Sequence, residues 1–104
     1  MNCEELWNQI ASNLTSGGKE LKTLYKGLWF RASSDGKTVY IDKAIDNTPA
    51  CAITNQRKVT KKDFLLVCSY YSRWAAGEVG IRHEVSRKSR NTAYVFSLID
   101  DSCL

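Results

Sequence analysis

The spacing of apolar residues changes twice along this chain, and few folds accommodate both changes. Over residues 3–13 and just beyond, Leu6, Ile10 and Leu14 lie four positions apart, which is the spacing of one apolar face of a helix. Farther along, apolar residues alternate instead, as they do in strands with one buried face. Helical spacing returns over residues 61–76. A helix, then strands, then helices predict an α+β domain.

The region of residues 28–44 is predicted to form an antiparallel hairpin. Two β-rich segments flank Asp35-Gly36, a dipeptide typical of hairpin turns. Apolar side chains share one face of each segment: Leu28, Phe30 and Ala32 in the first, Val39 and Ile41 in the second. Shorter strands are predicted at residues 22–25 and 50–54, on either side of this hairpin.

A central helix of about residues 61–76 has the strongest helical signal. Thr60 can cap its start, and Asp63, three residues later, gives a variant of the capping box. One apolar face of helical spacing follows: Phe64, Val67, Cys68, Tyr71 and Ala75. Gly77 is predicted to end this helix, as Gly17-Gly18 ends the N-terminal one.

The rest of the C-terminal part leaves alternatives open. Residues 79–85 fit a short strand or an extended loop. Residues 92–99 fit a short helix that Asn91 can cap, with Tyr94 and Leu98 one turn apart. They also fit a strand, since the sequence Tyr-Val-Phe is β-prone.

A chain of 104 residues has room for one domain with a single modest core, spanning residues 1–104. The predicted architecture is a small antiparallel sheet, built on the 28–44 hairpin and packed against the N-terminal helix, the central helix and a short C-terminal helix. Such a sheet leaves an edge and a face open, and aromatic residues make up 11% of the chain. We therefore expect the chain to form a homodimer.

The sequence predicts a cytoplasmic protein without a membrane span. No run approaches the roughly 18 apolar residues that a span requires. The N-terminus carries Glu4 and Glu5 where a secretory signal would carry positive charge.

The four cysteines are scattered along the chain: Cys3, Cys51, Cys68 and Cys103. No two of them form a C-x-x-C pair, and the chain has a single histidine. We therefore expect neither a metal site nor a cofactor. We expect all four cysteines to be reduced thiols, with Cys68 buried on the apolar face of the central helix.

The net charge of +4 comes from one segment of the chain. Residues 1–56 hold six basic and six acidic side chains, residues 57–90 hold nine basic and three acidic ones, and residues 91–104 add two acidic ones. Two clusters carry the excess: Arg57, Lys58, Lys61 and Lys62 at the start of the central helix, and Arg82, Arg87, Lys88 and Arg90 before the last element. Asymmetry of this kind is informative about binding partners.

These basic residues predict a surface that contacts the phosphates of nucleic acid. Arginine grips phosphate oxygens in a planar fork, and the start of a helix favours anions. Tyr70, Tyr71 and Trp74 can supply stacking faces for bases if they remain exposed. The same basic residues also fit a solvated helix end and a polar loop that bind nothing, or a surface for an acidic protein partner. We expect a binding protein, not an enzyme.

A second hypothesis is a cleft between sheet and helix that binds a small ligand. Its candidate residues combine aromatic walls with polar groups that would fix the ligand: Trp29, Arg31, Tyr40, Trp74 and His83. The aromatic members also fit an ordinary hydrophobic core. A small-ligand or protein-partner module of this kind would be a homo-oligomer with a regulatory or antitoxin-like role.

Enzymatic roles have less support in the sequence. A cysteine nucleophile acting with His83, the one histidine, would have no local signature around it. Asp42 and Lys43 together with Glu84 give only a thin basis for a metal-dependent nuclease. No glycine-rich phosphate loop is present in the sequence.

Two successive segments of the C-terminal half together form one recognisable pattern. In KVTKKDFLLVCSYYSRW a Phe-bearing helix follows a Thr cap, and in SRNTAYVFSLI an Asn-Thr-x-Tyr-Val step follows. The matching residues are Thr60, Asp63, Phe64, Tyr71, Asn91, Thr92, Tyr94 and Leu98. In this pattern the chain resembles the tail module of small uncharacterised bacterial proteins, some of which travel on mobile elements such as integron gene cassettes. The resemblance covers under half of the chain and implies a bacterial, mobile-gene origin and a winged-helix-like C-terminal half.

Overall fold

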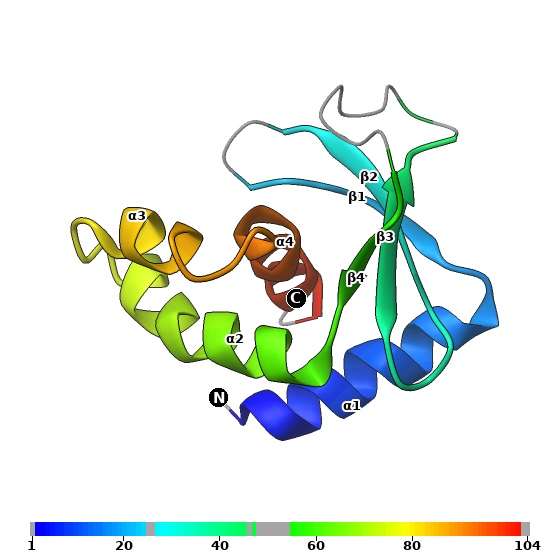
Figure 1. Cartoon of the computed structure of the whole chain (residues 1–104), viewed down its shortest axis with the longest axis horizontal. Coiled ribbons are helices and arrows are strands. Elements are labelled where there is room, and N and C mark those ends of the chain that lie inside the picture. The colour runs from blue at the N-terminus through cyan, green and yellow to red at the C-terminus, as the bar shows by residue number, and fades with distance from the viewer. Residues whose placement is uncertain (1, 25–26, 46, 48–54, 103–104) are drawn as a thin grey trace.

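A computed structural model describes residues 2–24, 27–45, 47 and 55–102 of the chain (Figure 1). An N-terminal helix precedes a four-stranded antiparallel sheet, and three helices that pack together follow it. The elements in chain order are α1 (Cys3–Asn13), the 3₁₀ helix η1 (Leu14–Ser16), β1 (Lys19–Lys22), β2 (Trp29–Ser34), β3 (Val39–Lys43), β4 (Arg57–Val59), α2 (Lys61–Ala75), α3 (Ile81–Ser86) and α4 (Thr92–Ser102). This order confirms the predicted α+β class.

The sheet has the strand order β1-β2-β3-β4, with every neighbouring pair antiparallel. The predicted hairpin is confirmed as β2 and β3, whose inward side chains are fully buried: Phe30, Ala32, Val39 and Ile41. Leu28 does not share this face, because it precedes β2 and is 40% exposed. The core therefore lies between one face of the sheet and the helices, as Figure 1 shows.

The shorter strands differ from the predicted ones. β1 begins at Lys19, three residues before the strand predicted at 22–25, and Thr23 already belongs to the connection, where its amide donates to the Leu28 carbonyl. The strand predicted at 50–54 lies outside the described residues. β4 was not predicted, because a three-residue strand is too short to show alternation.

Gly18 is required where the chain enters β1. Its φ of +77° lies in the left-handed region, which side chains rarely adopt. A Cβ atom at this position would also lie 2.9 Å from the Ala32 carbonyl oxygen of β2. Both constraints fit the predicted stop after the N-terminal helix, which buries Leu6, Trp7, Ile10 and Ala11.

The α2 helix follows its prediction closely. The Thr60 hydroxyl oxygen accepts a hydrogen bond of 3.2 Å from the Asp63 amide, which confirms the predicted cap. The predicted apolar face is buried from Phe64 to Tyr71, but Ala75 in the last turn is exposed. At this end Trp74 makes the contact with α4, with its ring centroid 4.8 Å from that of Phe96.

The segment predicted as a strand or extended loop at 79–85 is mostly a helix, α3, and both alternatives were wrong for it. Gly80, with a φ of +83°, lets the chain reverse after α2. Ile81 and Val85, four positions apart, are both buried. The spacing of this pair is helical, but a helix of six residues is too short for that spacing to repeat.

The α4 helix resolves the helix-or-strand alternative of the last segment in favour of a helix. Its main-chain hydrogen bonding begins at Asn91, whose carbonyl oxygen accepts a hydrogen bond of 2.9 Å from the Val95 amide. The helix lies between α2 and the sheet and is buried on nearly all sides, which explains why its sequence lacks an amphipathic pattern. None of the described helices is long and apolar enough to cross a membrane.

A disulfide between Cys3 and Cys68 joins the start of α1 to the middle of α2, with Cα atoms 6.0 Å apart. The prediction that all four cysteines are reduced is therefore wrong for this pair. The sequence separation of 65 hides the pairing, since only the packing of α1 on α2 brings the two cysteines together. Cys51 and Cys103 lie outside the described residues.

Candidate nucleic-acid interface

The fold brings part of each basic cluster together where β4 meets the turn between α3 and α4. A side-chain nitrogen of Arg57, Nη1, donates to the Arg90 carbonyl oxygen at 3.3 Å. The side-chain amide of Asn91 donates to the Lys58 carbonyl oxygen at 3.2 Å. These two hydrogen bonds span 33 residues of sequence and hold the turn against the strand. We call the basic surface at this contact the junction surface, and it consists of Arg57, Lys58, Arg87, Lys88 and Arg90.

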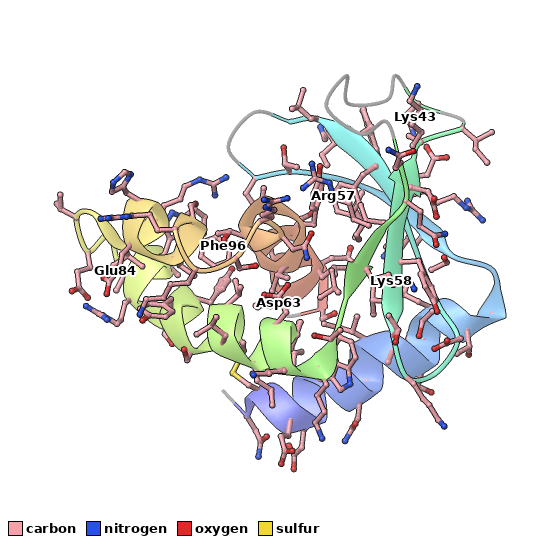
Figure 2. All side chains as sticks on the ribbon, in the orientation of Figure 1. Lys43, Arg57, Lys58, Asp63, Glu84 and Phe96 are labelled. Carbon is pink, nitrogen blue, oxygen red and sulfur yellow. A yellow bond between two sulfur atoms is a disulfide. The ribbon has the colours of Figure 1, made fainter. Side chains whose placement is uncertain are left out.

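Arg57 and Lys58 point to opposite sides of β4 (Figure 2). Arg57 pairs in register with the buried Ile41 and is half-buried, with its guanidinium carbon 5.5 Å from the centre of the Tyr94 ring. Lys58 pairs with Tyr40 and is exposed. Arg57 therefore positions the turn as well as carrying charge, whereas Lys58 presents its charge to solvent.

The turn itself carries three exposed basic side chains: Arg87, Lys88 and Arg90. The Lys88 ammonium donates to the Tyr70 hydroxyl at 2.8 Å and lies 5.3 Å from the centre of the same ring. The hydrogen bond to Tyr70 raises the pKa of Lys88 above its ordinary value. Lys88 is thereby held against α2, and Arg87 and Arg90 are the exposed arginines of the turn.

The start of α2 contributes less than the sequence predicts. Lys61 forms an ion pair of 2.9 Å with Glu4 of α1, which offsets its charge. The Asp63 carboxylate already occupies the first turn, where it accepts a hydrogen bond of 2.9 Å from the Asn91 side chain. A carboxylate at this position competes with any external anion for the amide dipoles of the helix start. Lys62 is exposed beside them.

Arg82 lies away from the junction surface, on α3. Its guanidinium carbon is 5.9 Å from the centre of the buried Phe96 ring. Together with His83 it lines an open pocket of about 550 Å³ between the end of α2 and α3. We call this the α3 pocket, and its lining residues are Trp74, Glu78, Gly80, Arg82, His83 and Ser86.

The five residues of the predicted small-ligand cleft are not brought together. Trp74 and His83 line the α3 pocket. Trp29, Arg31 and Tyr40 lie on the outer face of the sheet, and α3 lies at the other end of the molecule from β3 in Figure 1.

The three outer-face residues are also engaged within the chain. The Lys22 ammonium lies 5.4 Å from the centre of the Trp29 ring. Arg31 donates to the Gly17 carbonyl oxygen. The Tyr40 hydroxyl donates to the Asp35 carboxylate at 2.9 Å, and this bond raises the pKa of Tyr40.

The residue combinations considered for catalysis are also separated. Lys43 and Glu84, which a metal-dependent nuclease would need together, are labelled at opposite ends of Figure 2. Cys68 is bonded to Cys3 and is not a free nucleophile. Within the described ranges, no three His, Cys, Asp or Glu side chains are grouped so that they could hold a metal ion.

Sequence reasoning missed the side chains that organise the junction surface. Asn91 was assigned only a capping role, yet its amide joins β4 to Asp63 at the start of α2. Tyr70 was assigned only a stacking role, yet it receives the Lys88 hydrogen bond. An asparagine directly after a basic run was the one available signal, and it did not indicate which strand the asparagine would contact.

Comparison of the chain with protein-family models, with curated proteins and with solved structures finds no match. The resemblance to bacterial mobile-element proteins, and the origin it implies, therefore stay predictions.

Proposed function

We propose that this chain binds nucleic acid, mainly through backbone phosphates, on the junction surface. The observation that supports the proposal is the pair of hydrogen bonds from Arg57 to Arg90 and from Asn91 to Lys58, because they place two separate basic segments side by side. Phosphate contacts of this kind need clustered positive charge and no particular base sequence.

The balance of charge at this surface supports the same function. Five basic residues lie on the two segments joined there, with Arg57 and Lys58 on opposite sides of β4, and the neighbouring Asp63 carboxylate is engaged by the Asn91 amide. Arg87 and Arg90 are exposed, so their guanidinium groups can form bidentate contacts with phosphate oxygens without first breaking up a core.

The test is fluorescence anisotropy with labelled single- and double-stranded DNA and RNA at two salt concentrations. We expect micromolar or tighter binding that weakens steeply as salt rises. The double variant Arg87→Ala/Arg90→Ala should bind more weakly, and the magnitude of its salt slope should fall by about 2, since each lost phosphate contact accounts for about 1.

The matched control is Lys37→Ala/Lys43→Ala, which removes two exposed positive charges, one in the β2–β3 turn and one at the end of β3. A control that loses as much binding as the junction variant would mean that overall charge, not this surface, attracts nucleic acid. Absence of binding at low salt would refute the proposed function.

The alternative is a small-ligand or protein-partner module with a regulatory or antitoxin-like role. One observation favours it: Trp74 and His83, two of the five residues predicted for such a cleft, line the same pocket. Self-association, which the aromatic content led us to expect, stays a prediction that light scattering on the purified chain can test.

The cellular compartment of the protein bears on whether the disulfide forms. The Cys3–Cys68 disulfide would persist in an oxidising compartment, whereas the cytoplasm expected from the sequence would keep both thiols reduced. The proposed binding does not depend on whether this disulfide is formed. Figure 2 shows the disulfide between α1 and α2, away from the labelled Arg57. Trapping free thiols by alkylation during cell lysis would show which form the protein takes in its host.

A further inference from the structure

We infer that the chain prefers single-stranded nucleic acid and accepts one unstacked base in the α3 pocket. This inference rests on the proposed function and names its substrate class. Phosphates lie along the basic turn in this arrangement, and one base leaves the strand to enter the pocket beside it.

The pocket has a fixed aromatic wall. The half-buried Trp74 packs against two other rings, with centroid distances of 4.8 Å to Phe96 and 5.7 Å to Tyr71. These contacts hold the indole in place before any ligand arrives. An aromatic ring held in this way at a pocket wall is the usual platform on which an unstacked base is bound.

The pocket combines hydrogen-bond donors with an acceptor, as the edge of a base does. Arg82 lies in the pocket with one carboxylate, Glu78, which accepts hydrogen bonds of 2.9 Å and 2.6 Å from Arg73. The ion pair offsets the charges of Glu78 and Arg73 and leaves the Glu78 carboxylate at the pocket wall as a hydrogen-bond acceptor. A neutral base carries both donors and acceptors, which can pair with Glu78 on one side and with Arg82 or His83 on the other.

The pocket and the basic turn are continuous along the chain. Ser86 is the last pocket residue, and Arg87, the first basic residue of the turn, follows it directly. Four residue steps separate Ser86 from Arg90, which is a reach of at most about 14 Å. A single strand can therefore contact the turn through its phosphates while one of its bases lies in the pocket.

A duplex cannot make both contacts at equal cost. Its bases are paired and stacked inside, so one base would have to be flipped out before it could enter the pocket. The junction surface alone remains for a duplex, since phosphate contacts do not distinguish the two forms. The structure thus predicts a difference in affinity that arises in the pocket and not on the basic turn.

The experiment compares three labelled probes of equal charge per strand by fluorescence anisotropy: a mixed-sequence single strand, an abasic sugar–phosphate strand and a duplex. We expect the full chain to bind the base-containing single strand at least tenfold more tightly than the abasic strand or the duplex. The abasic probe tests the role of the base without any change to the protein.

Two tryptophan variants then locate the effect. Trp74→Leu should remove the preference for the base-containing strand, while Trp29→Leu, at a half-buried tryptophan on the outer face of the sheet, should keep it. If Trp74→Leu does not fold, as circular dichroism would show, the exposed His83→Ala variant replaces it and should weaken the preference.

The outcomes separate this inference from the proposed function. Equal binding of all three probes, still weakened in Arg87→Ala/Arg90→Ala, would overturn the base pocket and leave phosphate binding in place. A preference that persists in Trp74→Leu and His83→Ala would place the base elsewhere and overturn the inference as well. Failure of every probe to bind at low salt would overturn both.

Discussion

In the hairpin turn between β2 and β3, one carboxylate receives three hydrogen bonds. The backbone amides of Lys37 and Thr38 donate to Asp35, each at 2.8 Å, and the Tyr40 hydroxyl donates at 2.9 Å. These bonds, the one from Lys37 first, hold the pKa of Asp35 below its ordinary value of 3.8. The turn is therefore built for the charged form of this side chain.

The stability of the turn should depend on pH through Asp35. Because its folded pKa is lower than its unfolded pKa, the charged carboxylate stabilises the fold above pH 3.8, and this contribution is lost as pH falls through the folded pKa. A carboxyl NMR titration should find Asp35 titrating below 3.8. Tyr40→Phe, which removes one donor, should move that pKa upward. An unchanged pKa in Tyr40→Phe would show that the phenol contributes nothing to it.

Gly18 offers a second prediction for a single residue. Gly18→Ala should destabilise the fold by about 2 kcal/mol, because the new methyl group meets both a left-handed φ and the Ala32 carbonyl oxygen 2.9 Å away. The matched control is Gly77→Ala, where φ is +85° and no atom lies within 4 Å of the added Cβ. Urea unfolding should rank Gly18→Ala as the more costly change. Equal costs would mean that backbone conformation, not the close approach of β2, accounts for the effect.

Between elements, the disulfide fixes the start of α1 on α2. The ion pair from Lys61 to Glu4 and the contact of the Trp7 and Phe64 rings, 5.2 Å apart, join the same two helices. A disulfide that closes so long a loop restricts the unfolded chain, and its loss typically costs about 2–4 kcal/mol. Reduction should therefore weaken the protein without abolishing the contact of α1 with α2.

The prediction is a marked fall in the free energy of unfolding on reduction or in Cys3→Ser/Cys68→Ser. Urea titrations with and without a phosphine reductant measure the cost, and mass spectrometry after alkylation counts the free thiols. Cys51→Ser/Cys103→Ser is the control, and it should keep the full response to the reductant. Equal stability of oxidised and reduced protein would mean that the disulfide makes no net contribution.

How much of each element could be predicted depended on its length. The α1 and α2 helices and the β2–β3 hairpin were predictable because each repeats its apolar spacing several times. The α3 helix has six residues and β4 has three, so neither repeats a pattern long enough to recognise. For α4 the difficulty was the opposite one, because a helix buried nearly all round shows no polar face.

At the scale of the whole molecule, the candidate site depends on contacts that the sequence does not show. The charge count located the basic segments, but only the packed fold reveals that Arg57 reaches the Arg90 carbonyl while Lys61 is paired with Glu4. The same limit explains why the residues of the predicted small-ligand cleft are not brought together. Its residues share a chemistry, but Trp29 lies on the sheet and Trp74 on α2. Residue type indicated which side chains could bind, and long-range packing decides which of them can act together.

Asn91 gives a prediction at this scale, because its one side chain links β4, the start of α2 and the α3–α4 turn. Asn91→Ala should lower the free energy of unfolding by about 1–2 kcal/mol, since it removes the donor to both the Lys58 carbonyl and the Asp63 carboxylate. Nucleic-acid binding should also weaken. The salt slope should stay near that of the parent, however, because no positive charge has been lost.

Asn91→Asp sharpens the test, since it replaces the donor with a second carboxylate beside Asp63 and should be the more damaging variant. Asn8→Ala, at an exposed position of α1, is the control and should change neither stability nor binding. Urea unfolding and anisotropy on the same preparations supply both measurements. If Asn91→Ala loses stability but binds nucleic acid as tightly as the parent, the basic turn does not need to be held against β4. The proposed interface would then reduce to the turn alone.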